Sequence, residues 1–114
     1  RALKLQAQAA RFGFDWPELK DVWAELEEEW RQLREAASAA NAQETELGDL
    51  LFSLVNLARW LHIDAESALR GRMERFERRI HDMEQECAAC GRRLSELSFA
   101  ELNELWQQES KRIG

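Results

Sequence analysis

Tryptophan recurs every seven residues in the first third of the chain, at Trp16, Trp23 and Trp30. A leucine follows each of them by three residues (Leu19, Leu26 and Leu33). Spacings of three, four and seven place residues on one face of an α-helix, so the pattern predicts a long helix that ends near residue 37. This apolar stripe is wide for a chain of 114 residues, and we expect it to lie either in the core or against a second subunit.

Capping and helix-breaking residues predict that the rest of the chain is also helical. Gly13 ends a first helix over 3–12, and Asp15 with Glu18 forms a capping box around Pro17, before the long helix. A connection at 38–41 precedes a third helix that ends near residue 62, and a fourth helix extends toward Gly91. The caps expected for the last three helices are Asn41 with Glu44, Asp64, and Ser98 with Glu101.

The apolar residues expected to face inward on the third helix are Leu47, Leu50, Leu51, Leu54, Val55, Ala58 and Leu61. Leu69, Phe76, Ile80, Met83 and Cys87 continue the apolar pattern on the fourth helix. Short connections favour antiparallel neighbours. The predicted fold is therefore all-α, an antiparallel helical bundle of about five helices that forms one domain over 1–114.

The net charge of −6 argues against a protein that binds nucleic acid through bulk charge. Ser53, Asn56 and Arg59 interrupt the longest apolar run, so we expect no membrane-spanning segment. The chain opens on helix-like sequence without the pattern of a signal peptide, and two cysteines make no disulfide framework. We therefore expect a cytoplasmic protein.

Acidic residues gather in two groups, one on the second helix and one on the third. Residues three apart share a helix face, so Glu29 pairs with Gln32 and Glu46 pairs with Asp49. If the two helices fold back on each other near residues 39–40, the two pairs lie within about one turn, ~5 Å, of the same level. Like charges this close repel, and a hard divalent cation relieves the repulsion. The pattern predicts a site for Mg²⁺, with Mn²⁺ as a substitute.

A run of glutamates is more often a solvated helix face than a metal site. The segment 47–52 favours the metal site, because it places Gly48 and Asp49 among apolar residues. A glycine inside a helix costs about 1 kcal/mol relative to alanine, and an uncompensated carboxylate in apolar surroundings costs more. Such costs usually mark a close approach or a functional site.

Three arginines, Arg72, Arg75 and Arg79, are spaced by three and four on the fourth helix and share one face. They form either a solvated basic face or a surface that neutralises phosphate charge. Cys87 and Cys90 lack the further ligands of a zinc site and the βαβ context of a redox motif, so we expect them to pack as small apolar residues near a helix end.

Two segments, EEEWRQLRE at 27–35 and ELGDLLF at 46–52, resemble the MazG family of nucleoside triphosphate pyrophosphohydrolases. That family shows a Glu-Glu-x-x-Glu motif followed at a short interval by Glu-x-x-Asp. Other phrases agree with it: GFDWP at 13–17, VNLAR at 55–59, FERR at 76–79 and LNELW at 102–106. The likeness covers nearly the whole chain. The chain resembles a single catalytic module, such as one cut from a longer protein.

The resemblance implies an all-α fold that forms a homodimer. It also implies Mg²⁺-dependent cleavage of nucleoside triphosphates between the α- and β-phosphates, which gives a monophosphate and pyrophosphate. The site residues that it implies are Glu28 and Glu29 for the leading pair, Glu46 and Asp49 for Glu-x-x-Asp, Arg75 and Arg79 for phosphate contacts, and Trp106 for stacking on the nucleotide.

Three positions depart from the family pattern. Gln32 stands at the third glutamate, where an amide oxygen can still bind a cation but brings no charge and cannot act as a base. Met73 replaces an asparagine, and Arg75 replaces a lysine, which keeps the charge but changes its geometry. Gln32 is either a natural loss or an engineered change, and we expect it to reduce activity.

The leading hypothesis is a homodimeric, Mg²⁺-dependent pyrophosphohydrolase for nucleotide pool sanitation or control of a signalling nucleotide. In it, Glu28, Glu29, Gln32, Glu46 and Asp49 surround the metal, Glu28 or Glu29 activates water, and Arg72, Arg75, Arg79 and Trp106 bind the substrate. One alternative is a catalytically degenerate helical module that binds nucleotide or protein, which Gln32 and Met73 favour. Another is a dimerising domain with an acidic, solvated face.

Overall fold

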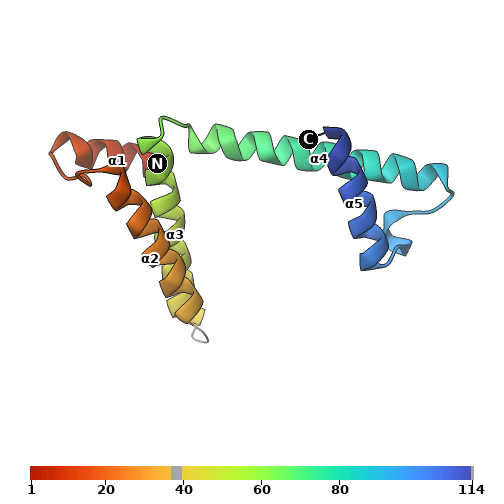
Figure 1. The fold of residues 1–114 in the computed structure, drawn as a ribbon, viewed down its shortest axis with the longest axis horizontal. Helices are drawn as coiled ribbons and strands as arrows, with labels where there is room; N and C mark the ends of the chain where they lie inside the picture. The colour runs from red at the N-terminus through yellow and green to blue at the C-terminus, as the bar shows by residue number, and fades with distance from the viewer. Residues whose placement is uncertain (37–39, 114) are drawn as a thin grey trace. The chain divides into compact units, whose positions relative to one another are not determined.

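A computed structural model describes residues 1–36 and 40–113 of the chain (Figure 1). Within these residues there are five α-helices, one short 3₁₀ helix and no strand, so the all-α prediction is confirmed. The chain divides into two compact units, residues 1–65 and residues 66–114, and each is described by itself below. The prediction of one domain over 1–114 stays a prediction.

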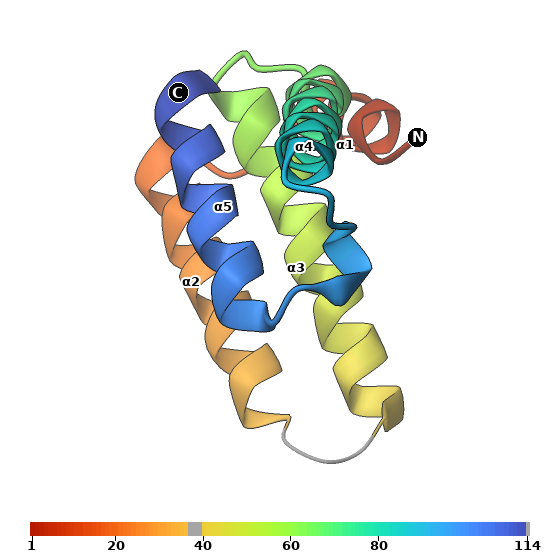
Figure 2. The same cartoon turned by 90° about the vertical axis from the view of Figure 1, so that its right-hand side faces the viewer.

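The first unit contains α1 (Ala2–Arg11), α2 (Leu19–Glu35) and α3 (Ala40–Trp60). Helices α2 and α3 run antiparallel and side by side (Figure 1 and Figure 2), as the sequence predicted. Helix α1 packs against α3. Gly13 follows α1 with φ +85°, a left-handed conformation that glycine adopts without a steric penalty and that explains why α1 ends there.

Two predicted caps of this unit are wrong. Helix α2 has its N-cap at Glu18, whose backbone N–H donates to the Asp21 carboxylate at 3.1 Å, so the capping box lies three residues later than expected. Asp15 is absent from this box because Arg59 and Trp60 of α3 bind its carboxylate. Helix α3 begins at Ala40, which places Asn41 inside the helix, and residues 37–39 of the expected connection lie outside the described residues.

The core of the first unit is small. Val22, Leu50 and Leu57 are buried, and Leu57 was not among the residues expected to face inward. The expected inward residues that are exposed are Leu47, Leu51, Leu54 and Leu61, so this part of the prediction is wrong within the first unit. The tryptophans of α2 and the segment before it are also half exposed, from 40% at Trp16 to 54% at Trp30. The apolar stripe is therefore not part of the buried core of the first unit.

The second unit contains most of α4 (Ala65–Ala89), then η1 (Leu94–Glu96) and α5 (Phe99–Ile113). Helix α4 begins directly after Asp64, at the position the sequence predicted. The capping box at the start of α5 is confirmed, since the Glu101 N–H donates to Ser98 Oγ at 3.2 Å and the Ser98 N–H donates to Glu101 Oε1 at 3.0 Å. Met83 and Cys87 are the buried apolar residues of α4.

No helix in the described part of the chain combines the length and the apolar character that a membrane crossing requires.

Candidate functional site

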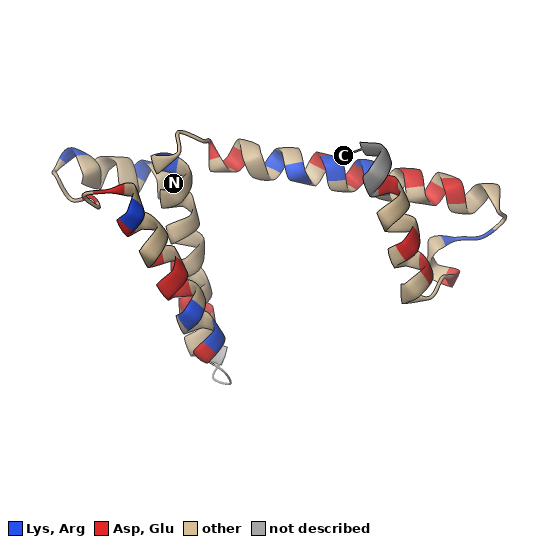
Figure 3. Ribbon diagram, in the orientation of Figure 1, with Lys and Arg blue, Asp and Glu red and all other residues tan. Residues whose placement is uncertain are grey.

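Three carboxylates converge between α2 and α3. Glu29 comes from α2, and Glu46 and Asp49 come from α3, one turn apart on the same face. One oxygen of each carboxylate lies within 4.8 Å of an oxygen of the other two. Figure 3 shows acidic residues along the part of the hairpin that carries them. The convergence expected from the antiparallel pairing is therefore present.

The cluster is electrostatically unfavourable on its own. A hydrogen bond shared with the Glu25 carboxyl, partial burial, and the negative charges of Glu25, Asp49 and Glu46 together raise the pKa of Glu29 to about 7. Oε2 of Glu29 and Oε2 of Glu46 are buried without a hydrogen-bond partner. Buried oxygens normally have partners, so these two atoms are positioned for a cation.

The residue types fit a hard divalent cation. Carboxylate oxygens are the ligands that Mg²⁺ prefers, and Mg²⁺ keeps several waters in place of further protein ligands. Asp49 is exposed rather than buried, and a Cβ on Gly48 would meet no atom within 4 Å. The free-energy cost of a buried carboxylate therefore applies to the partly buried Glu29 and Glu46 rather than to Asp49. In the described part of the chain, no other segment comes close to Gly48.

Glu28 and Gln32 are bonded to each other rather than to the cluster. The Gln32 amide nitrogen donates to Glu28 Oε1 at 3.1 Å, and Arg31 makes an ion pair with the same carboxylate. The hydrogen bond and charge of Arg31 lower the pKa of Glu28 and keep it ionised. Glu28, expected in both the catalytic and the metal sets, therefore lies outside the group of three converging acids.

Two arginines of α4, Arg72 and Arg79, lie over an aromatic pair of the second unit. Trp106 of α5 and Phe76 of α4 have ring centroids 5.4 Å apart. The Arg79 guanidinium carbon lies 3.8 Å from the centre of the Trp106 ring, and that of Arg72 lies 5.9 Å from it. Nε of Arg79 is buried without a hydrogen-bond partner. Three of the four predicted substrate-binding residues are thus brought together, while Arg75 is exposed and lies outside this stack.

Sequence reasoning missed a pocket of about 480 Å³ in the first unit. It is mostly apolar, and its lining includes Leu5, Gln6, Ala9, Phe14, Trp16 and Phe52. Gln6 of α1 is buried, and its amide nitrogen donates to the Phe52 carbonyl at 2.8 Å, which fixes the orientation of the side chain. Its Oε1 is buried without a hydrogen-bond partner.

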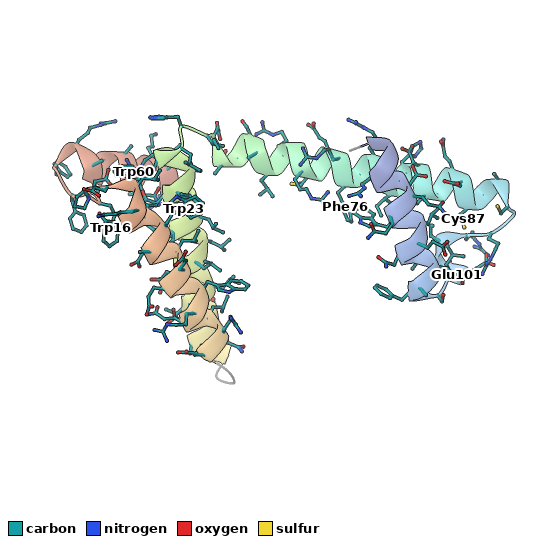
Figure 4. The ribbon with its side chains drawn as sticks, in the orientation of Figure 1. Trp16, Trp23, Trp60, Phe76, Cys87 and Glu101 are labelled. Carbon is teal, nitrogen blue, oxygen red and sulfur yellow. The ribbon has the colours of Figure 1, made fainter. Side chains whose placement is uncertain are left out.

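The loop that closes this pocket is fixed by Asp15. The Asp15 carboxylate accepts hydrogen bonds from Arg59 Nη2 at 2.7 Å, from Trp60 Nε1 at 3.2 Å and from the Trp16 N–H at 2.8 Å. Partial burial raises the pKa of Asp15, but these hydrogen bonds outweigh it and leave the pKa below its ordinary value. Trp16 and Trp60, which flank this contact, are labelled in Figure 4.

The missed residues carry uneven signals in the sequence. Glu25 is one of the acidic residues of the second helix, but it was given no role in the site, although its spacing of four from Glu29 could have placed it beside the cluster. No local pattern links Gln6 to Phe52 or Asp15 to Arg59, because these partners are more than forty residues apart.

Comparison with known proteins adds independent evidence. The sequence model of one protein family, the MazG nucleotide pyrophosphohydrolase domain, matches residues 18–83 of the chain. The chain is 41% identical over 107 residues to the nucleoside triphosphate pyrophosphohydrolase/pyrophosphatase MazG of Thermotoga maritima, covering 94% of this chain and 42% of that protein. It is 39% identical over 112 residues to the nucleoside triphosphate pyrophosphohydrolase of Escherichia coli K12, covering 95% of this chain and 43% of the relative.

A third relative, the uncharacterized protein YabN of Bacillus subtilis, is 35% identical over 65 residues, which is 57% of this chain and 13% of YabN. The chain thus spans less than half the length of each of these proteins. The domain match includes the three converging carboxylates and most of α4. From this match and these identities, we conclude that the chain belongs to the MazG nucleotide pyrophosphohydrolase family.

Proposed function

We propose that this chain hydrolyses nucleoside triphosphates between the α- and β-phosphates, giving a nucleoside monophosphate and pyrophosphate. The observation that carries the proposal is the convergence of Glu29, Glu46 and Asp49, with two buried oxygens that lack partners. The relatives from Thermotoga maritima and Escherichia coli, whose names state this activity, support it. Free nucleoside triphosphates occur in the cytoplasm, where we expect the protein to act in nucleotide pool sanitation or control of a signalling nucleotide.

Glu29, Glu46 and Asp49 would hold Mg²⁺, with Mn²⁺ as a substitute, and Gln32 would offer a neutral amide oxygen beside them. When bound, the cation would neutralise the phosphate oxygens and lower the pKa of a water molecule. A carboxylate of Glu28 or Glu29 would orient that water and accept its proton. Glu28 suits the part of this role that orients the water, because it lies outside the three ligands and Arg31 and Gln32 fix its position. Its lowered pKa makes it the weaker proton acceptor of the two.

We propose that the arginines of α4 bind the phosphate chain. Arg79 and Arg72 lie over the Trp106 ring, which limits the side-chain freedom that phosphate binding would otherwise cost. The buried Nε of Arg79 lacks a partner, and Arg75 is exposed and available as a further donor. Guanidinium groups bind phosphate oxygens through two parallel hydrogen bonds, so each of the three arginines can neutralise part of the negative charge of a triphosphate.

We propose that the nucleoside part of the substrate enters the pocket beside α1. Asp49, Phe52 and Asn56 follow one another at spacings of three and four on α3, so the pocket wall continues along the helix from the acidic cluster. Phe52 is about 4.5 Å and Asn56 about 10 Å along the axis from Asp49, a span that suits phosphates at one end and a base at the other. Trp16 and Phe14 offer faces for stacking.

The exposed apolar stripe supports a homodimer. Trp23, Trp30 and Leu51 are 44–55% exposed, and α2 and α3 carry further exposed leucines. Apolar surface on this scale usually marks an interface. We propose that a second copy of the chain covers it, and sedimentation equilibrium would give twice the chain mass. A monomer at all concentrations would contradict the dimer without affecting the proposal for the metal.

The test of the proposed activity is product analysis. The chain is incubated with Mg²⁺ and a panel of nucleoside triphosphates, and monophosphate and pyrophosphate are separated by chromatography. We expect both products in equal amounts, none with EDTA, and a loss on the order of 10³-fold or more in Asp49→Ala. Glu44→Ala removes an exposed acid from the same helix outside the cluster and serves as the matched control. Release of inorganic phosphate, or full turnover by Asp49→Ala, would contradict the proposal.

Gln32 supports one competing function, a degenerate domain that binds nucleotide without turnover. The family pattern has a third glutamate at this position, and the amide side chain of Gln32 carries no charge there. Its nitrogen donates to Glu28 Oε1 at 3.1 Å. Calorimetry with Mg²⁺ and a triphosphate would show binding in both cases. Absence of pyrophosphate over hours, together with binding, would favour the degenerate domain over the enzyme.

A further inference from the structure

The two cysteines of the chain lie at the C-terminal end of α4, in a tight turn. The Cys90 N–H donates to the Cys87 carbonyl at 3.0 Å, an i to i−3 bond that narrows the last turn of the helix. Gly91 follows with φ +72°, its N–H donates to the Ala88 carbonyl at 2.9 Å, and the Arg92 N–H donates to the Cys87 carbonyl at 3.1 Å. These bonds form a Schellman motif that ends the helix.

This turn brings the two thiols close to disulfide range. Residues three apart on a helix have Cβ atoms about 5–6 Å apart, and a disulfide needs about 3.5–4.5 Å. The two Cβ atoms must therefore approach each other by about 1–2 Å. Cys90 follows Ala89, the last residue of α4, so a small movement of the backbone there breaks no helical hydrogen bond outside the terminal turn. A Cβ at Gly91 would meet no atom within 4 Å, so the turn has room to adjust.

The two thiols also differ in accessibility. Cys87 is 6% exposed, whereas Cys90 is exposed, and both line a pocket of about 270 Å³. Arg92 and Glu101 also line this pocket and form an ion pair at 3.0 Å that joins the turn to α5. Cys87 and Glu101 are labelled in Figure 4. A small oxidant can therefore reach the exposed Cys90 thiol first, because the Cys87 thiol is buried.

We propose that Cys87 and Cys90 are a redox-modification site that hydroperoxides convert to an intramolecular disulfide. The Cys90 thiol first gives up its proton, and the thiolate sulfur attacks one oxygen of the peroxide to form a sulfenic acid. The O–O bond breaks, and the leaving group takes up the proton that Cys90 released: hydroxide from hydrogen peroxide leaves as water, and alkoxide from an organic hydroperoxide leaves as an alcohol. Cys87 then attacks the sulfur of the Cys90 sulfenic acid, its own proton goes to the departing hydroxide, and water leaves. The two sulfurs give two electrons to the peroxide, and a thiol reductant reverses the change.

A metal site does not explain the pair. Within the described residues, the acidic cluster of the first unit is the one group of three or more His, Cys, Asp or Glu ligands close enough to share an ion. Two thiolates alone fall short of the four ligands of structural zinc. The proposal concerns the second unit alone and does not depend on the proposed enzymatic activity.

The test uses the folded, reduced chain with a small excess of hydrogen peroxide, followed by alkylation, trypsin and mass spectrometry. Cleavage after Arg79 and Arg92 leaves both cysteines in the single peptide 80–92. We expect this peptide to lose two hydrogen atoms and escape alkylation, and to regain both alkyl groups after treatment with dithiothreitol. Met83 lies in the same peptide and is 3% exposed, so its oxidation, which adds oxygen, reports any unfolding.

Single variants separate the two roles. In Cys87→Ala, the Cys90 sulfenic acid should persist and react with dimedone, because no second thiol displaces it. In Cys90→Ser, Cys87 should stay reduced over the same time, because it is only 6% exposed. Circular dichroism establishes that each variant is folded. Two alkylated thiols in the peroxide-treated wild type, or only dimers linked between chains, would overturn the proposal.

Discussion

Replacing Asp49 with asparagine separates stability from function in the acidic cluster. Two unit charges 4.8 Å apart repel by about 1 kcal/mol in water and by about 3.5 kcal/mol at an effective dielectric constant of 20. Asp49 is exposed, so the lower limit applies, and it faces two carboxylates, Glu29 and Glu46. Asp49→Asn should therefore stabilise the metal-free protein by about 1–2 kcal/mol.

The assay is thermal unfolding with EDTA and then with millimolar Mg²⁺, at pH 8, where Glu29 with its pKa of about 7 is ionised. We expect the metal-free variant to melt roughly 5–10 °C above the wild type. Mg²⁺ should raise the Tm of the wild type but leave that of the variant nearly unchanged. Glu44→Gln, an exposed acid on the same helix, should change Tm little with or without Mg²⁺.

The reasoning would be refuted if Asp49→Asn lowered the Tm of the metal-free protein, or if Mg²⁺ stabilised the variant as much as the wild type. The first result would mean that Asp49 stabilises the fold through contacts rather than destabilising it by charge. The second would mean that any bound ion lies elsewhere.

Three further predictions concern other parts of the chain. Arg79→Ala should raise KM and lower kcat/KM about 10–100-fold, because it removes the guanidinium over the Trp106 ring. Arg78 is an exposed neighbour outside the stack, so Arg78→Ala serves as the control and should change KM and kcat less than about twofold. Gln32→Glu should raise activity or Mg²⁺ affinity in a titration, and a fall in both would make the amide an adapted ligand. The lowered pKa of Asp15 means that its ionised form stabilises the fold above its ordinary pKa and that this stability is lost as pH falls through the lowered value. Asp15→Asn should therefore cost about 1–2 kcal/mol in urea unfolding at pH 7 and reduce the loss of stability below pH 4, and equal acid sensitivity in both proteins would contradict the role of the Arg59 contact.

The acidic cluster could be predicted because it depends on local regularities. Helical periodicity fixes which face Glu46 and Asp49 share, and the short connection between α2 and α3 fixes their height relative to Glu29. The capping box of α5 was predicted for the same reason, since Ser98 and Glu101 are three residues apart. Features set within one or two turns of helix are accessible from sequence.

Features that depend on residues far apart in the chain could not be predicted from the sequence. Asp15 has the residue type and spacing of a helix cap, but Arg59 offers its carboxylate a charged partner from another helix. The pocket beside α1 depends on the contact between Gln6 and Phe52, which has no local signature. On α3, periodicity identified an apolar face, but it could not say which of its residues the neighbouring helices cover, and Leu51 and Leu54 are exposed in the first unit.

The central claim is that Glu29, Glu46 and Asp49 bind one shared divalent cation, and Mn²⁺ tests it residue by residue. Paramagnetic Mn²⁺ added below equimolar amounts to the ¹⁵N-labelled protein broadens the amide signals nearest to it. The account predicts that the amides around these three residues broaden first, that those of α1 follow only at higher Mn²⁺, and that excess Mg²⁺ restores the sharp signals. Broadening centred on another part of the chain, or the same broadening in Asp49→Asn, would contradict it.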